Sequence, residues 1–378
     1  MATIFWIAGE NSGDLHASYV MKELQDYGFN HVGIGGYQMQ KRGLQVLFPF
    51  NRFNVMGFWE VLKHLRFFAK VEKFIKEYLK KNKPELVILV DYPGMNLRIA
   101  KIASELNIPV FYYICPQFWA WKHHRVKQLA DYTNQVACIL PFEPDLLYIH
   151  QVNSEYVGSP IVEEINIKMS KEEFGKATRL DSNKKWLSFF PGSRIDEVNK
   201  LLPIFLNTIK LLNANEYEFL ISRAPTISEK DFLKLLNRNF RDVAKLRILV
   251  SNNYEMMHYS DFSVVKSGTS SLEAAYIGNP FVICYKSNPI SYWIARNIIK
   301  IKYIGLPNIL MNRAIVPEFI QNDVNPKKIK SIINSTLADK GMYQSIKENL
   351  KDLQNVLGNK AASKETARLV LALLNRDK

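Results

Sequence analysis

Residues 266–273 (KSGTSSLE) follow a short apolar run at 262–265 and combine one glycine with four hydroxyl side chains. At a turn from strand to helix, backbone N–H groups and hydroxyls can hold a diphosphate, and a glycine lets it approach closely. Glu273, one helical turn later, could accept hydrogen bonds from ribose hydroxyls. A capping box led by Thr269 or Ser270 is the alternative interpretation, and both can hold together. The expected nucleotide contacts are Ser267, Gly268, Thr269, Ser270, Ser271 and Glu273.

Arg194 ends a second glycine-bearing turn, with the sequence FPGSR, after an apolar run at 186–190. Arginine combines a permanent positive charge with a planar fork of donors that matches phosphate oxygens. An ordinary surface arginine is the alternative interpretation. We favour the phosphate site slightly, because the turn delivers the side chain to the end of a predicted strand.

Asp91 follows the apolar run at 85–90 and precedes Tyr92 and Pro93. Ligands of open α/β sheets bind at the carboxyl ends of the strands, where a partly dry carboxylate can act as a general base. Aspartate shortly before proline is also a common turn or capping residue. The sequence gives these two interpretations equal weight.

The first glycine turn, AGENSGD at residues 8–14, lies between a predicted strand and a predicted helix. It has neither the GxGxxG pattern of dinucleotide sites nor a Walker A lysine. A tight turn in which Ser12 or Asp14 caps the helix is modestly favoured by the spacing alone. A second glycine group, GIGG at 33–36, is equally ambiguous. The candidate substrate contacts in the first turn are Gly9, Glu10, Ser12, Gly13 and Asp14.

Residues 116–125 (PQFWAWKHHR) are dense in aromatic and basic side chains. Trp119 and Trp121 could stack on a sugar or a base, but no nucleic-acid-binding pattern accompanies them. His123 and His124 are adjacent and lack the i, i+4 spacing of a helical metal site, and the other histidines are scattered. We therefore predict no metal site, no cofactor and no nucleic-acid partner.

Residues 58–81 form a long amphipathic segment with seven Lys or Arg and three Glu. An ordinary helix packed on a sheet is the commoner explanation of such a pattern. The aromatic side chains exceed what one core-facing stripe needs, however, so we predict partial contact with an anionic membrane. The residues expected to contact membrane or acyl chains are Phe58, Trp59, Leu62, Leu65, Phe67 and Phe68.

Composition restricts the class of protein. The 378 residues include 50 Lys or Arg against 36 Asp or Glu, a net charge of +14 that suits an anionic partner. Three dispersed cysteines, Cys115, Cys138 and Cys284, argue against a disulfide scaffold and a zinc ribbon. The first residues are not expected to form a signal peptide, and no apolar stretch reaches bilayer length.

The candidate site residues lie in a chain where short apolar runs alternate with stretches of helical periodicity. Runs at 3–8, 85–90, 108–114, 135–140 and 155–157 predict one parallel sheet, and runs at 186–190, 218–222, 246–250, 262–265 and 281–285 predict a second. We therefore expect two Rossmann-like domains, at 1–160 and 161–344. Helices at about 345–378 are expected to pack back on the first domain or to swap with a partner chain.

Two such domains, one with a diphosphate turn and the other with an acid, describe a nucleotide-sugar transferase that needs no metal. A P-loop kinase is excluded because its motif is missing. A UDP-sugar epimerase or another sugar transferase is the nearest alternative, since it shares the 267–273 turn. A basic nucleic-acid-binding protein is the least favoured alternative.

Several segments together resemble the lipid-A-disaccharide synthase family, almost from end to end. Each is weakly specific alone, but their order is highly specific. The segments are AGENSGD (8–14), GIGG (33–36), MGFWEVL (56–62), DYP (91–93) with Asn96-Leu97, FWAW (118–121), LPFE (140–143), Val157-Gly158, PGSR (191–194), SGT (267–269) with LEA (272–274), and LPN (306–308) with Arg313, Glu318 and Gln321.

The resemblance implies a GT-B fold, with two Rossmann-like domains facing across a cleft. It implies inverting transfer of 2,3-diacylglucosamine from UDP to the 6-hydroxyl of 2,3-diacylglucosamine 1-phosphate, at the cytoplasmic face of the inner membrane. Asp91 is then the candidate base, while Arg194 and the 267–271 turn stabilise the departing diphosphate. A homodimer is a further expectation. The family pattern adds Asn308, Arg313 and Gln321 to the donor pocket.

The sequence departs from the family pattern at three places. Asn11 replaces the usual alanine, and Gly94-Met95 replaces the usual Asp-Phe after the Asp-x-Pro motif. Residues 115–118 (CPQF) replace the usual Ser-Pro-Ser-Val. The second departure removes an acid beside the presumed base, and the third is expected to alter acceptor or acyl contacts rather than the reaction.

Overall fold

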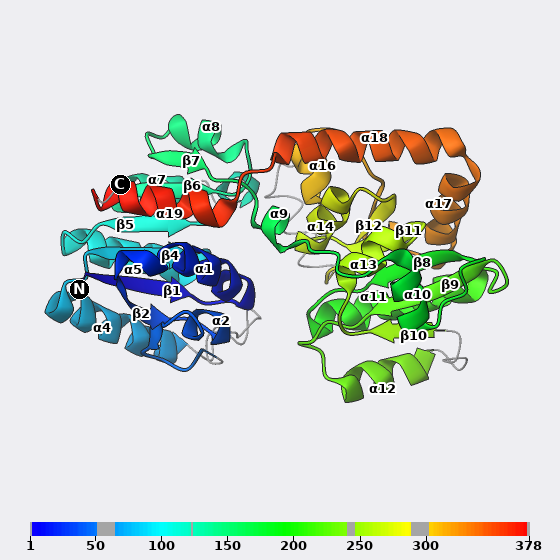
Figure 1. The fold of residues 1–378 in the computed structure, drawn as a ribbon, viewed down its shortest axis with the longest axis horizontal. Helices are drawn as coiled ribbons and strands as arrows, with labels where there is room; N and C mark the ends of the chain where they lie inside the picture. Colours follow the sequence, from blue (N-terminus) through cyan, green and yellow to red (C-terminus); the bar gives the residue numbers. More distant parts are fainter. Residues whose placement is uncertain (1, 51–64, 122–123, 240–245, 289–301, 376–378) are drawn as a thin grey trace. The chain divides into compact units, whose positions relative to one another are not determined.

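The computed structural model describes residues 2–50, 65–121, 124–239, 246–288 and 302–375. The chain falls into two units: unit 1 comprises Met1–Glu163 and Asn359–Lys378, and unit 2 comprises Glu164–Gly358 (Figure 1). Each unit is built on one parallel sheet. The expected α/β class with two Rossmann-like domains is confirmed.

Unit 1 contains a seven-stranded parallel sheet in the order β3-β2-β1-β4-β5-β6-β7. The central strands are apolar on both faces, and every residue of β4 is buried, as expected where helices cover both sides. The sequence runs predicted five of these strands but missed β2 and the two-residue edge strand β3. The strands are β1 (Thr3–Ala8), β2 (Asn30–Ile34), β3 (Gln45–Val46), β4 (Leu86–Val90), β5 (Val110–Tyr113), β6 (Gln135–Cys138) and β7 (Ser154–Tyr156).

Helices cover both faces of this sheet and form two apolar clusters with it. One cluster joins the strands to α4, α5 and α7 through residues such as Val71, Ile99 and Leu129. The other joins them to α1 and α19 through residues such as Val20 and Val370. The helices are α1 (Asn11–Glu23), α2 (Tyr37–Gln40), α4 (Leu65–Asn82), α5 (Pro93–Glu105), α6 (Phe118–Trp121), α7 (His124–Tyr132), α8 (Glu143–Tyr148), α9 (Pro160–Glu164) and α19 (Ala362–Leu373), with the 3-10 turn η1 (Gln25–Tyr27).

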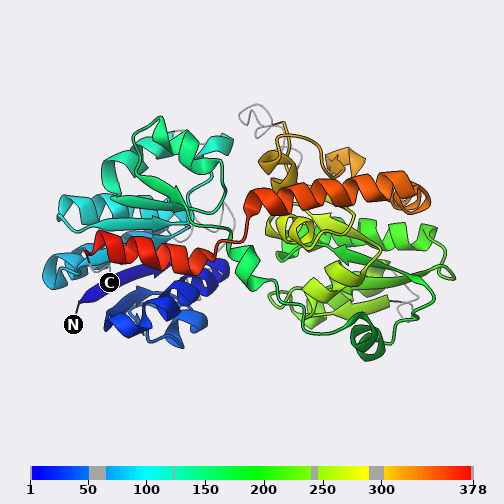
Figure 2. The same ribbon diagram turned by 45° about the horizontal axis from the view of Figure 1, so that its top comes forward.

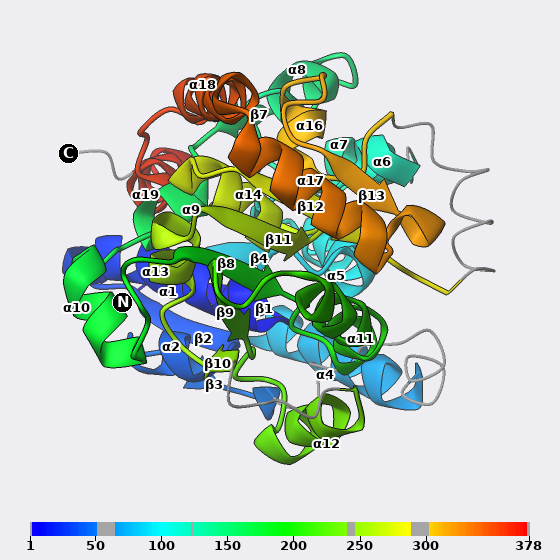
Figure 3. The ribbon, with the colours of Figure 1, turned by 90° about the vertical axis from the view of Figure 1, so that its right-hand side faces the viewer.

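Unit 2 contains a six-stranded parallel sheet in the order β10-β9-β8-β11-β12-β13. Helices α11 and α17 lie on one side of it and α13 and α14 on the other (Figure 3). The strands are β8 (Lys185–Phe190), β9 (Tyr217–Ser222), β10 (Leu246–Leu249), β11 (Phe262–Lys266), β12 (Phe281–Tyr285) and β13 (Glu318–Ile320). The helices are α10 (Lys171–Thr178), α11 (Ile195–Leu211), α12 (Glu229–Asn239), α13 (Asn253–Tyr259), α14 (Thr269–Ile277), α16 (Leu306–Leu310), α17 (Pro326–Ala338) and α18 (Lys340–Leu357), with the 3-10 turn η4 (Gln321–Asp323).

The C-terminal helices divide between the two units. We expected the returning segment to begin near residue 345, but α18 belongs to unit 2 and only Asn359–Lys378 belongs to unit 1 (Figure 2). Gly358 ends α18 with a φ of 65°, a conformation that favours glycine. The chain thus leaves unit 2 at this residue and enters α19, which packs on α1 in unit 1.

Each sheet has one position where the strand order reverses. In unit 1 it lies between β1 and β4, and in unit 2 between β8 and β11. Connections from the two strands leave toward opposite sides there, and open α/β sheets usually bind their ligands at the carboxyl ends of such strands. In the described part of the chain, no helix is long and apolar enough to cross a membrane.

Candidate functional site

Asp91 stands at the strand reversal of unit 1, directly after β4, in a strained but well-held backbone conformation. Asp91 and Tyr92 have φ angles of 46° and 48°, which non-glycine residues rarely adopt. The Asp91 carbonyl accepts hydrogen bonds from Tyr112 Oη and Asn96 Nδ2, both at 2.7 Å. The Asp91 N–H donates to the Tyr113 carbonyl at 2.9 Å. Three neighbouring groups therefore fix the direction in which the carboxylate leaves the backbone.

The surroundings of Asp91 make it a better base than an ordinary aspartate. Burial, reinforced by the negative charge of Glu10, raises the pKa of Asp91 from 3.8 to about 6. The Tyr92 N–H, His16 and Arg125 act in the opposite direction and favour the ionised form. The carboxylate is therefore ionised at neutral pH but holds a proton more strongly than usual, as a general base requires.

The first glycine turn supports this acid. A Cβ on Gly9 would lie 2.7 Å from the Tyr92 ring, so only glycine lets this turn pack against the residue after Asp91. Asp14, which we expected as a helix cap or a substrate contact, instead binds the second glycine turn. Its carboxylate accepts hydrogen bonds from the N–H groups of Gly36, Gln38 and Met39 at 2.7, 3.0 and 3.1 Å.

The capping interpretation of this turn was wrong. The N-cap of α1 is Glu10, whose side chain does not cap the helix. The Asp14 carboxylate instead binds the N-terminal end of α2. Gly13 packs against Val90 at the end of β4, since a Cβ there would lie 3.5 Å from it. Glu10 is half-buried and Ser12 is exposed. The substrate contacts expected at Gly9, Glu10, Ser12, Gly13 and Asp14 remain predictions.

Sequence reasoning missed Glu143 as a functional residue, although it lies in the LPFE segment. Its side chain is 1% exposed, and its two oxygens accept hydrogen bonds from Trp119 Nε1 and the Leu140 N–H, both at 3.2 Å. Burial raises the pKa of Glu143 to about 8, and the nearby Asp91 charge adds to this effect. No sequence signal reveals the burial of this acid, because it precedes a proline in a polar turn.

Glu143 changes two expectations. Trp119, a predicted stacking residue, has its indole N–H bound to Glu143 and its ring set edge-on to Phe142 with centroids 5.3 Å apart. The loss of the usual acid at Gly94-Met95 also does not leave Asp91 without a neighbouring carboxyl group. Glu143 is close enough for the charge of Asp91 to raise its pKa, and the charge of Glu10 raises the pKa of Asp91.

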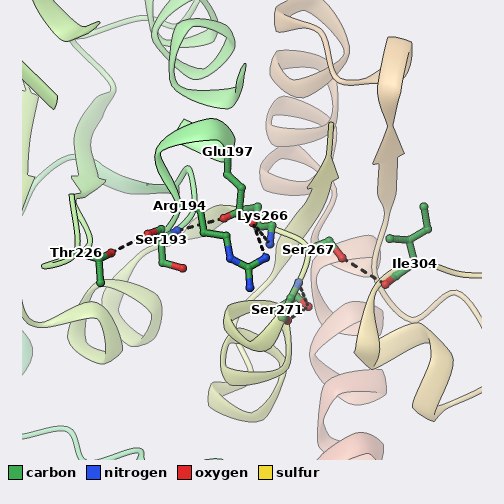
Figure 4. Close-up of polar contacts among 9 residues, drawn as sticks. Ser193, Arg194, Glu197, Thr226, Lys266, Ser267, Ser271 and Ile304 are labelled. Carbon is green, nitrogen blue, oxygen red and sulfur yellow. Dashed lines mark hydrogen bonds and ion pairs between the residues drawn. The ribbon is translucent and has the colours of Figure 1, made fainter. Parts of the chain in front are cut away.

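In unit 2, Arg194 and Lys266 converge on one carboxylate (Figure 4). Glu197 Oε1 lies 2.7 Å from Lys266 Nζ and 3.8 Å from an Arg194 nitrogen, and Oε2 accepts the Ser193 N–H at 3.3 Å. Gly192 has a φ of 114°, and a Cβ there would meet Glu197 at 2.5 Å. The glycine is therefore required for this turn to close over the carboxylate.

The 267–273 turn forms the other half of this strand reversal. Gly268, with a φ of 148°, is the N-cap of α14, so the expected cap at Thr269 or Ser270 was wrong. The Ser271 hydroxyl donates to the Gly268 carbonyl at 2.6 Å, and the Ser267 hydroxyl donates to the Ile304 carbonyl at 3.3 Å (Figure 4). These two hydroxyls hold the turn, while Thr269 is exposed and Ser270 half-buried at the helix start.

The remaining residues of the predicted donor pocket make internal contacts. The buried amide of Asn308 makes four hydrogen bonds, to the N–H groups of residues 315 and 316, the carbonyl of residue 316 and the Glu318 carboxylate. Arg313 binds Asn349 and Asp352 on α18. Gln321 accepts the Ser287 N–H at 2.9 Å. Glu273 accepts a long hydrogen bond from Tyr254 Oη at 3.5 Å.

Comparison with known proteins identifies the family. Residues 4–372 match the family described as lipid-A-disaccharide synthetase. The chain belongs to this family. The lipid-A-disaccharide synthase of Nitrosococcus oceani is 36% identical over 372 residues, covering 97% of this chain and 95% of that protein. Lipid-A-disaccharide synthase 1 of Legionella pneumophila is 35% identical over 374 residues, covering 97% and 96%.

Solved structures with little sequence similarity share the fold of this family member. UDP-GlcNAc 2-epimerase of Neisseria meningitidis, solved with UDP-GlcNAc bound, has a TM-score of 0.66 at 14% identity and covers 99% of both chains. MurG of Acinetobacter baumannii has a TM-score of 0.59 at 15% identity, covering 98% of this chain and 99% of its own. The expected GT-B fold is confirmed.

The lipid-A-disaccharide synthetase family is one of glycosyltransferases, so the chain is a member of an enzyme family, as predicted.

The structure describes only some of the residues that were predicted to contact membrane or acyl chains. Phe58, Trp59 and Leu62, and the side chain of Leu65, lie outside the described residues. Phe68 is 6% exposed within the core of unit 1, and Phe67 packs against the same core. The assignment of Phe68 to a membrane surface was therefore wrong, because the helix turns it toward the sheet.

Proposed function

We propose that this protein transfers 2,3-diacylglucosamine from UDP to the 6-hydroxyl of 2,3-diacylglucosamine 1-phosphate. The products are the β-1,6-linked tetraacyl disaccharide 1-phosphate and UDP. The observation that carries the proposal is the family match over residues 4–372, which spans both strand reversals and their charged turns. Unit 1 is proposed to serve the acceptor and unit 2 the UDP-sugar donor.

The chemistry is a single displacement at the anomeric carbon. The acceptor's 6-hydroxyl loses its proton to the Asp91 carboxylate as its oxygen bonds to C1 of the donor. The bond from C1 to the β-phosphate oxygen breaks, and its electron pair leaves with UDP. Attack opposite to the leaving group converts an α-linked donor into a β-linked product, so one base suffices and no covalent sugar–enzyme intermediate is needed.

The base assignment rests on the setting of Asp91. Its pKa of about 6 leaves the carboxylate ionised at neutral pH, while hydrogen bonds from Tyr112 and Asn96 to the Asp91 carbonyl hold the backbone that carries it. Fixed geometry of this kind lowers the entropic cost of proton transfer. Glu10 and Ser12 are proposed to contact the acceptor sugar from the adjoining turn.

The leaving group is proposed to be stabilised by unit 2. Arg194 and the N-terminus of α14 lie at the same strand reversal, on the turns after β8 and β11. Preorganised donors aimed at developing negative charge lower the barrier to such a reaction. Thr269 and Ser270 are proposed to bind the diphosphate and Glu273 the ribose, while Asn308, Arg313 and Gln321 position the surrounding loops.

We also propose that the protein acts on the cytoplasmic surface of the inner membrane. Both substrates carry acyl chains, and the net charge of +14 favours an anionic lipid surface. Residues 58–65, with Phe67 at the border of the core, are the proposed contact. A homodimer remains a prediction from the resemblance.

The decisive assay incubates the protein with UDP-2,3-diacylglucosamine and 2,3-diacylglucosamine 1-phosphate in detergent with EDTA. Mass spectrometry should detect a disaccharide 1-phosphate, with one UDP released for each product. UDP release without acceptor-dependent product, or isomerisation of the UDP-sugar alone, would reject the proposal in favour of another UDP-sugar enzyme.

A further inference from the structure

Lys266 is a second cation at the strand reversal of unit 2, beside Arg194, and it has no role in the reaction proposed above. It is the last residue of β11, and its ammonium group lies 2.7 Å from Glu197 Oε1. Its side chain is 22% exposed, so it is not fully buried by the ion pair. Figure 4 shows Lys266, Arg194 and Glu197 gathered beside the start of α14.

Lys266 lies close to the 267–273 turn, the proposed diphosphate site. A Cβ placed on Gly268 would lie 3.3 Å from Lys266 Nζ, so the ammonium group lies beside the N-cap residue of α14. The first N–H groups of a helix favour an anion at this end. Lys266 therefore borders the same small region that the helix N-terminus faces.

The charges of the cluster do not balance. Among the described residues, Glu197 is the one carboxylate that forms ion pairs with both Arg194 and Lys266. These ion pairs bring two cations to one carboxylate beside the helix N-terminus. A cluster built only to close the β8 turn would need one cation for one carboxylate. An excess of cation and N–H donors suits a ligand with two or more negative charges.

We propose that Lys266 binds the diphosphate of the UDP-sugar and stabilises its charge as UDP departs, and that Glu197 positions Lys266 until the diphosphate arrives. This inference rests on the proposed function and deepens it by naming a second cation. Lys266 acts through its charge and transfers no proton. The phosphate oxygens take the place of the Glu197 carboxylate as its partner.

The test is calorimetric binding of UDP and of uridine to the full chain and its variants. Lys266→Gln should weaken UDP binding about tenfold or more, because a charged contact to phosphate is lost. Uridine binding should not change, since it carries no diphosphate. Lys266→Arg should recover most of the loss. Lys328→Gln is the matched control, because Lys328 forms an exposed ion pair with Asp323 in the same unit.

Glu197→Gln separates direct contact from a structural ion pair. This variant breaks the same pair from the other side but keeps the positive charge of Lys266 and an oxygen acceptor for the Ser193 N–H. A clearly smaller loss of UDP affinity than in Lys266→Gln supports direct contact. Equal losses in both variants, or an unchanged affinity in Lys266→Gln, would overturn the assignment and leave the proposed function standing. Failure of the unaltered protein to bind UDP would overturn both.

Discussion

At the scale of single residues, environment rather than residue type decides the chemistry. Asp91 and Glu143 are both carboxyl groups of unit 1, yet burial raises the pKa of Asp91 to about 6 and that of Glu143 to about 8. At neutral pH Asp91 is therefore mainly a base, whereas Glu143 is mainly protonated. Glu143 is suited to holding Trp119, not to accepting the substrate proton.

Replacing Asp91 by asparagine should abolish transfer but stabilise the fold. A folded pKa of about 6 against 3.8 means that ionisation costs up to about 3 kcal/mol above pH 6. Asparagine removes this cost and tolerates the positive φ. Its advantage in unfolding free energy should grow from pH 4 to 6 and then stay constant, as measured by urea denaturation. In the unaltered enzyme, kcat/KM should rise with pH through about 6.

An Asp91→Asn variant that retains more than a hundredth of the activity would contradict the assignment of the base. A stability difference independent of pH would contradict its raised pKa.

Glu143→Gln should change the pH dependence of stability over a wider pH range than Asp91→Asn does. The folded pKa is raised above the ordinary value of 4.5 to about 8, so the stability of the unaltered protein falls as pH rises between these values. The variant lacks this titration and should gain relative stability across the same range, with a plateau above pH 8. Denaturation at pH 5, 7 and 9 measures the trend. A parallel pH dependence of the two proteins would show that Glu143 ionises normally.

At the scale of elements, the turns at the two strand reversals depend on glycines at particular places. Gly9 allows the turn after β1 to pack against Tyr92, and Gly192 allows the turn after β8 to close over Glu197. The absence of a side chain at each glycine leaves room for a neighbouring side chain. Tyr92 adjoins Asp91 in the chain, and Glu197 pairs with Arg194. Each glycine therefore helps to position a charged residue of the candidate site.

Gly9→Ala should displace Tyr92 and lower kcat at least tenfold, since its Cβ would lie 2.7 Å from the Tyr92 ring and move the adjoining Asp91. Gly94→Ala is the matched control. It lies in the first turn of α5, with open space around its Cβ, and alanine favours a helix. Steady-state kinetics and thermal melting of both variants make the comparison. Equal kcat values would show that Tyr92 does not transmit the change to Asp91.

At the scale of the whole molecule, the chain leaves unit 1 near Glu163 and returns to it after Gly358. The returning helix α19 completes the apolar cluster on one face of the unit 1 sheet, with Val370 and Ala362 fully buried. The fold of unit 1 therefore depends on a C-terminal segment that all of unit 2, Glu164–Gly358, separates from its first part, whereas unit 2 is continuous in sequence.

Val370→Asp should destabilise unit 1 selectively, by about 3 kcal/mol or more, because it buries an unpaired charge. Calorimetry should show the transition of unit 1 at a lower temperature, while UDP still raises the transition of unit 2. Val356→Asp serves as the control, because Val356 is 43% exposed on α18. Loss of UDP stabilisation in Val370→Asp would show that the two units do not fold separately.

The class of fold could be predicted from the sequence, because buried parallel strands need apolar runs such as those at 86–90 and 262–265. Short edge strands such as β3 and β13 lack such runs and were not predicted. Order along the chain also placed Asp91 and Arg194 after strands, and the segments together determined the family. The fold class and the placement of Asp91 and Arg194 follow from short stretches of sequence. The family follows from the order of such stretches along the chain.

Which groups share a site, and whether each is charged, depends on the three-dimensional packing. Asp14 binds N–H groups more than 20 residues away, and Lys266 pairs with Glu197 across two neighbouring strand ends. The buried setting of Glu143 and the positive φ of Asp91 likewise arise from packing. Burial, pKa and ion pairing depend on everything that surrounds a group, and most of those neighbours are distant in sequence.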